Sequence, residues 1–156
     1  LGCPLAIANH GDYYCSDLVE LCQSVPGLGI LLDTGNCFLV GEKPLTAARE
    51  AAPYVLGTHL KDHHVFPSHK GPQDQGRVGG GLALCINGAA LGEGDADIAD
   101  LLRVLLNQAA DPEALVLMWE MVPPKDLNAY EALVRSWNGC RGIESECGYS
   151  SKEVLS

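Results

Sequence analysis

The chain has 156 residues, of which 47% are hydrophobic and 6% aromatic, and its ten lysine and arginine residues against twenty aspartate and glutamate residues give a formal net charge of −10. This composition is typical of globular proteins and argues against disordered and collagen-like classes. The acidic balance disfavours nucleic acid as a partner, because phosphates attract positive charge, and no apolar run reaches the roughly 18 residues that a membrane span requires.

The first part of the chain alternates apolar runs with helical patterns. Residues 3–9 (CPLAIAN) predict a strand, and the leucines and valines that follow at helical spacing predict a helix over 16–25. A second apolar strand is expected over 28–36. Pro44 then begins an alanine-rich stretch that predicts a helix over 44–54.

The second part repeats this alternation. A third strand is expected over 55–62, followed by a long connection over 63–93 without a clear pattern. A leucine stripe predicts a helix over 95–111, the apolar run 115–120 predicts the fourth strand, and a last helix is expected over 126–142. The buried side of this last helix is expected to consist of Tyr130, Leu133, Val134 and Trp137.

Strands that alternate with helices indicate an α/β fold. The strands are apolar throughout, which is typical of parallel strands that are covered on both faces. Four parallel βα units fit either a small doubly wound sheet or one half of a (βα)8 barrel, whose full length is about 250 residues. We expect one domain over 1–142 and, because the last residues are polar, a flexible tail over 143–156.

Seven cysteines are scattered along the chain without a CxxC pair. An odd number at irregular spacing is typical of reduced, buried thiols and not of a disulfide framework or a zinc knuckle. We therefore expect a protein of a reducing compartment, the cytoplasm.

Residues able to carry chemistry follow each predicted strand. They are Asn9, His10 and Asp12 after the first strand, Asp33 and Asn36 after the second, His59, Lys61 and Asp62 after the third, and Glu120 after the fourth. Any one of them is also explained as a turn residue. The carboxyl ends of parallel strands lie on one side of a sheet, however, so these side chains should converge on one rim and form a site.

Within this set, Asp33, His59 and Glu120 offer two carboxylates and an imidazole, which suit Mn, Mg, Co or Zn. Lys61 lies two positions after His59 and therefore faces the same side of a strand. A metal at such a rim can polarise a carbonyl while a carboxylate moves a proton. That chemistry is isomerisation or epimerisation next to a carbonyl.

Four motifs occur in a specific order: DTGN at 33–36, HLKD at 59–62, LGEGDAD at 91–97 and the strand that ends in Glu120. In this series the chain resembles the sugar phosphate isomerase/epimerase superfamily, the xylose isomerase-like TIM barrel group, from Leu5 to about Arg141. The resemblance implies that the chain holds the C-terminal half, strands five to eight, of a (βα)8 barrel. It also implies that the chain pairs with a partner, either the missing N-terminal half-barrel or a second copy of the chain.

The family binds a divalent metal through a Glu, an Asp, a His and a second Glu, which follow strands five to eight. The resemblance places the Asp at Asp33, the His at His59 and the second Glu at Glu120, whereas Ala8 stands where the first Glu is expected. In the sugar isomerases and epimerases of the family, both Glu residues also act as acid/base groups on opposite faces of the substrate carbon. Glu120 is therefore the implied proton-transfer residue, with Lys61 assisting at the substrate oxygens.

The implied ligand is a small sugar or sugar phosphate. In the family the loop after strand seven helps to close over the sugar, which makes Lys70 and Arg77 candidates for a substrate phosphate, with solvated loop charges as the alternative. The full set of candidate substrate-binding residues is Asn9, His10, Asn36, Asp62, Lys70 and Arg77.

Three functions remain open. A metal-dependent sugar or sugar phosphate isomerase or epimerase agrees with the three metal ligands. A non-catalytic, sugar-binding member agrees with Ala8, unless Asp12 replaces the missing Glu. An abasic-site endonuclease of the endonuclease IV type is disfavoured, because that chemistry uses more histidines, because Asn36 stands where one would follow Asp33, and because the chain is acidic.

Overall fold

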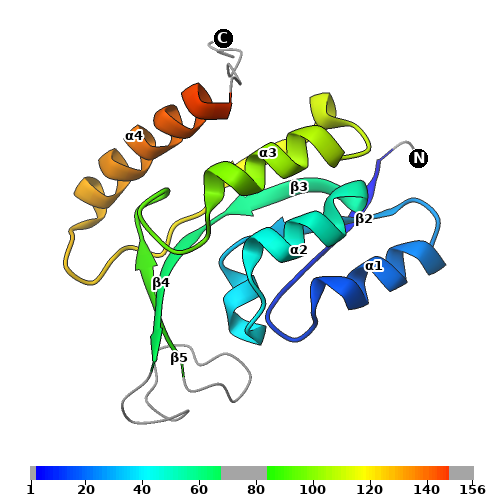
Figure 1. Ribbon diagram of the computed structural model, residues 1–156, viewed down its shortest axis with the longest axis horizontal. Helices are drawn as coiled ribbons and strands as arrows, with labels where there is room; N and C mark the ends of the chain where they lie inside the picture. The colour runs from blue at the N-terminus through cyan, green and yellow to red at the C-terminus, as the bar shows by residue number, and fades with distance from the viewer. Residues whose placement is uncertain (1–2, 68–83, 148–156) are drawn as a thin grey trace.

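The computed structural model describes residues 3–67 and 84–147 (Figure 1). In chain order the described strands and helices are β1 (Leu5–Ala8), α1 (Cys15–Ser24), β2 (Leu28–Asp33), α2 (Pro44–Ala51), β3 (Val55–Leu60), β4 (Asp62–Pro67), β5 (Leu84–Ala89), α3 (Ile98–Gln108), β6 (Val116–Trp119) and α4 (Ala129–Cys147). Short 3-10 helices span Asn36–Val40, Ala52–Tyr54 and Pro112–Ala114. Within the described ranges, no helix has the length and apolar character needed to cross a membrane.

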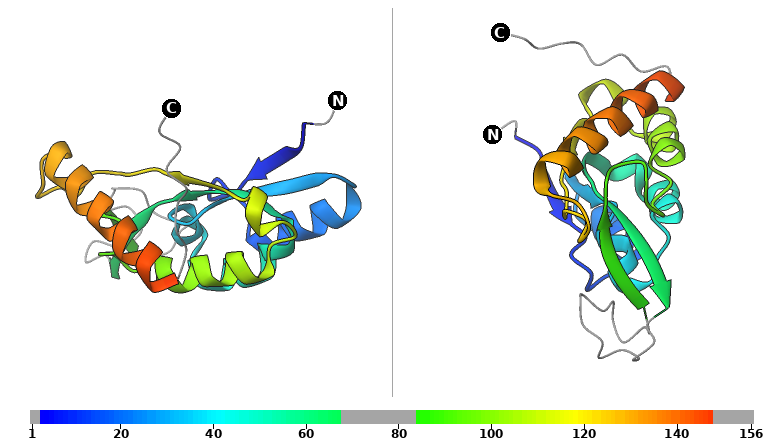
Figure 2. Two further views of the ribbon diagram at one scale, coloured as in Figure 1. Left: turned by 90° about the horizontal axis from the view of Figure 1, so that it is seen from above. Right: turned by 90° about the vertical axis from the view of Figure 1, so that its left-hand side faces the viewer.

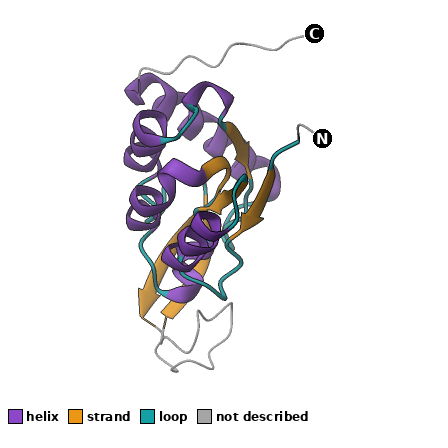
Figure 3. Cartoon of the chain, turned by 90° about the vertical axis from the view of Figure 1, so that its right-hand side faces the viewer, coloured by secondary structure: helices purple, strands orange, loops and turns teal. Residues whose placement is uncertain are grey.

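Four of these strands form a parallel sheet in the order β1-β2-β3-β6. The helices α1, α2 and α3 lie side by side on one face of this sheet, as Figures 2 and 3 show. The predicted α/β class with four parallel βα units is confirmed. A doubly wound sheet carries helices on both faces, so the arrangement is that of a barrel segment.

The two faces of the sheet differ in burial. Ile30 and Leu32 of β2 are fully buried and pack in the core formed with α1, α2 and α3. On the other face, Val116 and Met118 of β6 are 53% and 38% exposed. Because side chains alternate along a strand, Asp33 points to this second, inner face, which no described helix covers.

β4 and β5 form an antiparallel hairpin that the sequence did not predict. Pairing runs from Asp62 opposite Ala89 to Pro67 opposite Leu84, and the hairpin projects away from the main sheet in Figure 1. It occupies parts of the predicted connection over 63–93. The phosphate candidates Lys70 and Arg77 belong to the segment 68–83, outside the described residues.

α4 buries a different face from the predicted one. Its apolar side chains Tyr130, Leu133, Val134 and Trp137, here called the α4 stripe, are all exposed. The buried face carries small residues instead: Ala132 and Ser136 are fully buried, and a Cβ on Gly139 would lie 1.9 Å from the main-chain oxygen of Leu91. Ser136 Oγ also accepts a hydrogen bond from Leu91 N at 3.0 Å. Close approach to the 91–92 backbone therefore selects the small face and turns the α4 stripe outward.

The C-terminal end of α4 reaches Cys147, so the helix includes the first residues of the segment predicted as a tail. Ile143 within it is buried and joins a hydrophobic cluster with Leu91, Ile98 and Leu102. The helix continues past residue 142 because this side chain has a core to pack against.

Candidate metal centre

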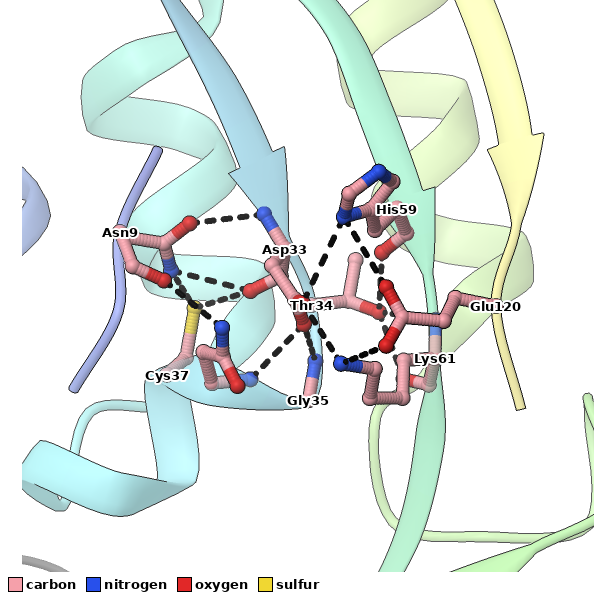
Figure 4. A network of polar contacts seen from close by, with 9 residues as sticks. Asn9, Asp33, Thr34, Gly35, Cys37, His59, Lys61 and Glu120 are labelled. Carbon is pink, nitrogen blue, oxygen red and sulfur yellow. Dashed lines mark hydrogen bonds and ion pairs between the residues drawn. The ribbon is translucent and has the colours of Figure 1, made fainter. Parts of the chain in front are cut away.

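Three ligand-type side chains meet at the carboxyl ends of the strands (Figure 4). Asp33 ends β2, His59 lies opposite it in β3, and Glu120 directly follows β6. His59 Nδ1 lies 3.1 Å from Glu120 Oε2 and 3.7 Å from Asp33 Oδ2. One ligand atom from each residue lies within 4.8 Å of the other two. The parallel sheet thus brings together the three residues predicted as metal ligands.

Lys61 places its ammonium group between the two carboxylates. Lys61 Nζ lies 2.8 Å from Asp33 Oδ2 and 2.8 Å from Glu120 Oε1. Burial acts to lower the pKa of Lys61, but its hydrogen bonds to Asp33 and Glu120 outweigh that effect and raise the pKa above its ordinary value. Lys61 is therefore a fixed positive charge at the centre of the site.

Asn9 fixes the position of Asp33. Asn9 Oδ1 accepts a hydrogen bond from Asp33 N at 2.7 Å, and Asn9 Nδ2 donates to Asp33 O at 2.9 Å. The Asp33 carboxylate in turn accepts the N–H groups of Gly35 and Asn36 on Oδ1, each at 3.0 Å. Only Oδ2 is left to face Lys61 and His59. Asn9 is 2% exposed and positions the candidate ligand Asp33, while its predicted contact with substrate stays a prediction.

Thr34 and Gly35 position Lys61, and neither was singled out from the sequence except as letters of the DTGN motif. Thr34 Oγ1 accepts from Lys61 N at 2.8 Å and donates to Lys61 O at 2.6 Å. A Cβ on Gly35 would lie 2.6 Å from the His63 ring and 2.7 Å from Lys61 Cδ. A glycine in the turn directly after an apolar strand is the signal that marks such a close approach.

Two cavities adjoin the site and share Lys61 and Glu120. The first, of about 350 Å³, is lined by the three ligand residues, Lys61, Leu39 and two predicted substrate residues, His10 and Asn36. The second, of about 450 Å³, extends between Asn36 and the β4–β5 hairpin. The hairpin therefore contributes a wall that sequence reasoning missed.

Asp62 does not face these two cavities. Its carboxylate accepts the N–H groups of His63, Gly92, Gly94 and Ala96 at 2.9 to 3.1 Å. It anchors the LGEGDAD loop at the start of α3. Alternation along the chain turns Asp62 to the side opposite His59 and Lys61, and its predicted substrate-binding role stays a prediction.

His63 lines the second cavity. His63 Nδ1 lies 3.2 Å from the main-chain oxygen of Asn87, so Nδ1 carries the proton. Burial lowers the pKa of His63 below its ordinary value of 6.5, against the smaller opposing effect of the bond to Asn87. Its ring also packs edge-on against Phe38.

Comparison with protein families identifies the fold. A family model described as xylose isomerase-like TIM barrel matches residues 2–137, which include all four strands of the parallel sheet. The chain belongs to this family. A search of curated proteins gave no match.

Two solved structures share this xylose isomerase-like fold. One is a xylose isomerase domain protein from Planctomyces limnophilus, with a TM-score of 0.65 and 21% identity over 93% of this chain and 47% of that one. The other is a xylose isomerase-like TIM barrel protein from Mycobacterium smegmatis in complex with magnesium, with a TM-score of 0.65 and 17% identity over 94% of this chain and 44% of that one. The chain therefore spans about half the length of these structures.

Ala8 is the last residue of β1, the first strand of this half-barrel, and pairs with Leu31 of β2. Asp12, the candidate substitute for a ligand there, is exposed and lies outside the ligand group. In the described part of the chain, the donor set around Lys61 consists of two carboxylates and one imidazole.

Proposed function

We propose that the chain is the metal-binding half of a sugar or sugar phosphate isomerase or epimerase. The observation that carries this proposal is the group Asp33, His59 and Glu120 around the Lys61 ammonium, at the strand ends of a xylose isomerase-like sheet. Two carboxylates beside a fixed positive charge suit a reaction that moves a proton next to a carbonyl.

The donor set fits a divalent cation of the Mn, Mg, Co or Zn type. Ligand atoms about 2.0–2.2 Å from one ion lie roughly 3.0–3.6 Å apart, and the separations from His59 Nδ1 of 3.1 and 3.7 Å are close to this. Glu120 can offer Oε2 to the ion while Oε1 stays with Lys61. When bound, the cation would polarise a substrate carbonyl or hydroxyl oxygen. Magnesium in the Mycobacterium smegmatis structure supports this class of ion.

Glu120 is the proposed proton-transfer residue. Its side chain is 46% exposed and lines both cavities, so a substrate carbon can approach the carboxylate. Lys61 holds its charge beside the substrate oxygens, and His10 and Asn36, which line the first cavity, are proposed to hydrogen-bond the sugar hydroxyls. Ala8 offers no second acid/base group from the opposite side.

We further propose that an N-terminal half-barrel completes the sheet, with a second copy of the chain as the alternative. β1 and β6 form the two edges of the sheet, the inner face is exposed at Val116 and Met118, and the α4 stripe faces outward. A closed barrel buries all three surfaces. Light scattering after size-exclusion chromatography distinguishes the cases: a dimer supports the second copy, a 1:1 complex with the upstream segment supports the half-barrel, and a cooperatively folding monomer contradicts both.

Proton exchange tests the activity. The chain, with and without the upstream half, is incubated in deuterated water with ketoses and ketose phosphates and each of the four metals in turn, and deuterium incorporation is followed by NMR. We expect metal-dependent exchange that Glu120→Gln lowers by about 10²- to 10⁴-fold. Glu113→Gln, in the 3-10 turn before β6, is the matched control and should leave exchange unchanged. Exchange that ignores a chelator, or that both variants lose equally, contradicts the proposal.

A sugar-binding member without catalysis is the second candidate, favoured by Ala8 and by Lys61. Lys61 Nζ already neutralises both carboxylates at 2.8 Å, where a cation would also act. Calorimetric metal titration of Ala8→Glu separates the two candidates. A sharp gain in metal affinity together with the onset of exchange indicates a degraded native site, whereas exchange by the wild type rules the second candidate out.

A further inference from the structure

A second group of metal-ligating side chains lies in the helix layer. Cys15 begins α1, Cys37 lies in the 3-10 helix Asn36–Val40, and Glu42 follows that helix before α2. One ligand atom from each of the three lies within 4.8 Å of the other two. The sequence predicted these cysteines only as scattered buried thiols, because residues 15, 37 and 42 show no ligand spacing along the chain.

Cys15, Cys37 and Glu42 are three groups with acidic protons that are packed close together. Cys15 and Cys37 are 0% and 1% exposed, and Glu42 Oε2 accepts a hydrogen bond from Cys15 N at 3.2 Å. A hydrogen bond to Cys37, burial, and the charges of Cys37 and Glu42 together raise the pKa of Cys15, and burial raises the pKa of Glu42. Three acidic groups packed in this way ionise together only if a cation offsets their charge.

We propose that Cys15, Cys37 and Glu42 form a second cation site, which binds Zn²⁺ or another thiophilic divalent ion. Zinc bonds of about 2.3 Å to sulfur and 2.0–2.2 Å to oxygen place ligand atoms about 3.3–3.8 Å apart, so side-chain movements of about 1 Å close the group on an ion. Binding releases the two thiol protons to solvent, and the filled site of one dication, two thiolates and one carboxylate has a net charge of −1.

The ligand types separate this site from the metal centre at the strand ends. Thiolates favour zinc over magnesium or calcium, whereas the carboxylates and imidazole at the strand ends also suit harder ions. Cys37 Sγ lies 3.5 Å from the main-chain oxygen of Asp33. Asn9 Nδ2, which donates to that same oxygen, also contacts Cys37 Sγ at 3.5 Å. A filled site would therefore cross-link α1 to the 3-10 helix Asn36–Val40, next to the Asn9–Asp33 contact of the candidate metal centre.

Cobalt substitution detects the thiolates directly. The full chain is reduced, unfolded and refolded with Co²⁺, because thiols this deeply buried need the ion during folding. We expect the near-ultraviolet charge-transfer absorption of thiolate bound to cobalt, which oxygen and nitrogen ligands do not produce, and added Zn²⁺ should remove it. Asp33→Asn, which weakens the metal centre, should keep this absorption.

Substitutions assign the ligands. Cys15→Ser and Cys37→Ser are expected to abolish the absorption and to remove one zinc per chain in elemental analysis. Cys22→Ser is the matched control, because Cys22 is buried in the same core about two turns further along α1 and belongs to neither ligand group of the described residues. Glu42→Gln keeps an oxygen for the Cys15 N–H and should weaken cobalt binding by at least about 10-fold.

The proposal is overturned if the refolded wild type shows no thiolate-to-cobalt absorption at saturating cobalt, or if Cys22→Ser loses as much of it as Cys15→Ser. It is also overturned if Glu42→Gln binds cobalt as tightly as the wild type. Circular dichroism of each variant separates loss of the ion from loss of the fold. Where a serine variant does not fold, the comparison between Glu42→Gln and the wild type decides.

Discussion

Replacing Lys61 by methionine tests whether its ammonium neutralises the carboxylates of Asp33 and Glu120. The Lys61 and Asp33 side chains are 5% and 3% exposed, with Nζ 2.8 Å from Oδ2. Removing one partner of such a buried pair costs about 3–5 kcal/mol, because the other charge stays buried without a counter-charge. Asp33 keeps two N–H donors on Oδ1, which favours the lower part of that range. The half-exposed pair with Glu120 adds at most about 1 kcal/mol.

We therefore expect Lys61→Met to lower the free energy of unfolding by about 3–4 kcal/mol in urea denaturation with a chelator present. Mn²⁺ or Mg²⁺ should stabilise the variant more than the wild type, because the cation then supplies the missing charge to Asp33 and Glu120. Adding Asp33→Asn should recover part of the loss, since it removes the charge that Lys61 neutralises.

The control for this experiment is Lys43→Met, which removes an exposed lysine before α2 and should change stability by no more than about 0.5 kcal/mol. A loss below about 1 kcal/mol for Lys61→Met in chelator would refute the assignment of the ammonium as the counter-charge of Asp33. Equal stabilisation of variant and wild type by metal would refute the claim that ion and ammonium serve the same carboxylates.

Three further substitutions test the surroundings of the site. Gly35→Ala puts a methyl group 2.6 Å from the His63 ring, so we expect the free energy of unfolding in urea to fall by about 1–3 kcal/mol. The control is Gly142→Ala, whose methyl group meets nothing within 4 Å and should not lower the free energy of unfolding. Burial holds the pKa of His63 below 6.5, so its contribution to stability is present above that value and is lost as the pH falls through the lowered pKa. His63→Gln should flatten the fall in stability between about pH 7 and pH 5, and a wild type that gains stability in that range contradicts the reasoning. Asp62→Ala leaves the N–H groups of residues 92, 94 and 96 without their acceptor, so hydrogen exchange at these amides should accelerate, and unchanged exchange would show that Asp62 does not hold the loop.

The ligand cluster was predictable because strand geometry alone decides where its members lie. Asp33 and Glu120 follow apolar runs, and parallel pairing puts the ends of such runs on one rim. Side chains alternate along this extended segment, so His59 and Lys61 point to one side and Asp62 points to the opposite side. The prediction placed Asp62 on the rim with the other residues that follow the third strand, without regard to this alternation.

The orientation of α4 was not predictable from periodicity. The α4 stripe recurs at helical spacing, but so do Ala132, Ser136, Gly139 and Ile143, and both faces satisfy a helical pattern. The buried face is the one that permits backbone contact with Leu91, which depends on where the LGEGDAD loop lies. That position follows from the three loop N–H groups that Asp62 accepts, a tertiary arrangement that no local pattern carries.

The contacts that position the candidate metal ligands lie within this chain, whereas the proposed substrate also needs contacts that the chain does not supply. Asn9 holds Asp33, and Thr34 holds Lys61, through hydrogen bonds between neighbouring strand ends. The inner face beside them is exposed at Val116 and Met118, and Ala8 leaves one side of the site without an acid/base group. Metal binding and turnover should therefore separate: a folded chain on its own is expected to bind the cation, and catalysis is expected to need the surface that covers the inner face.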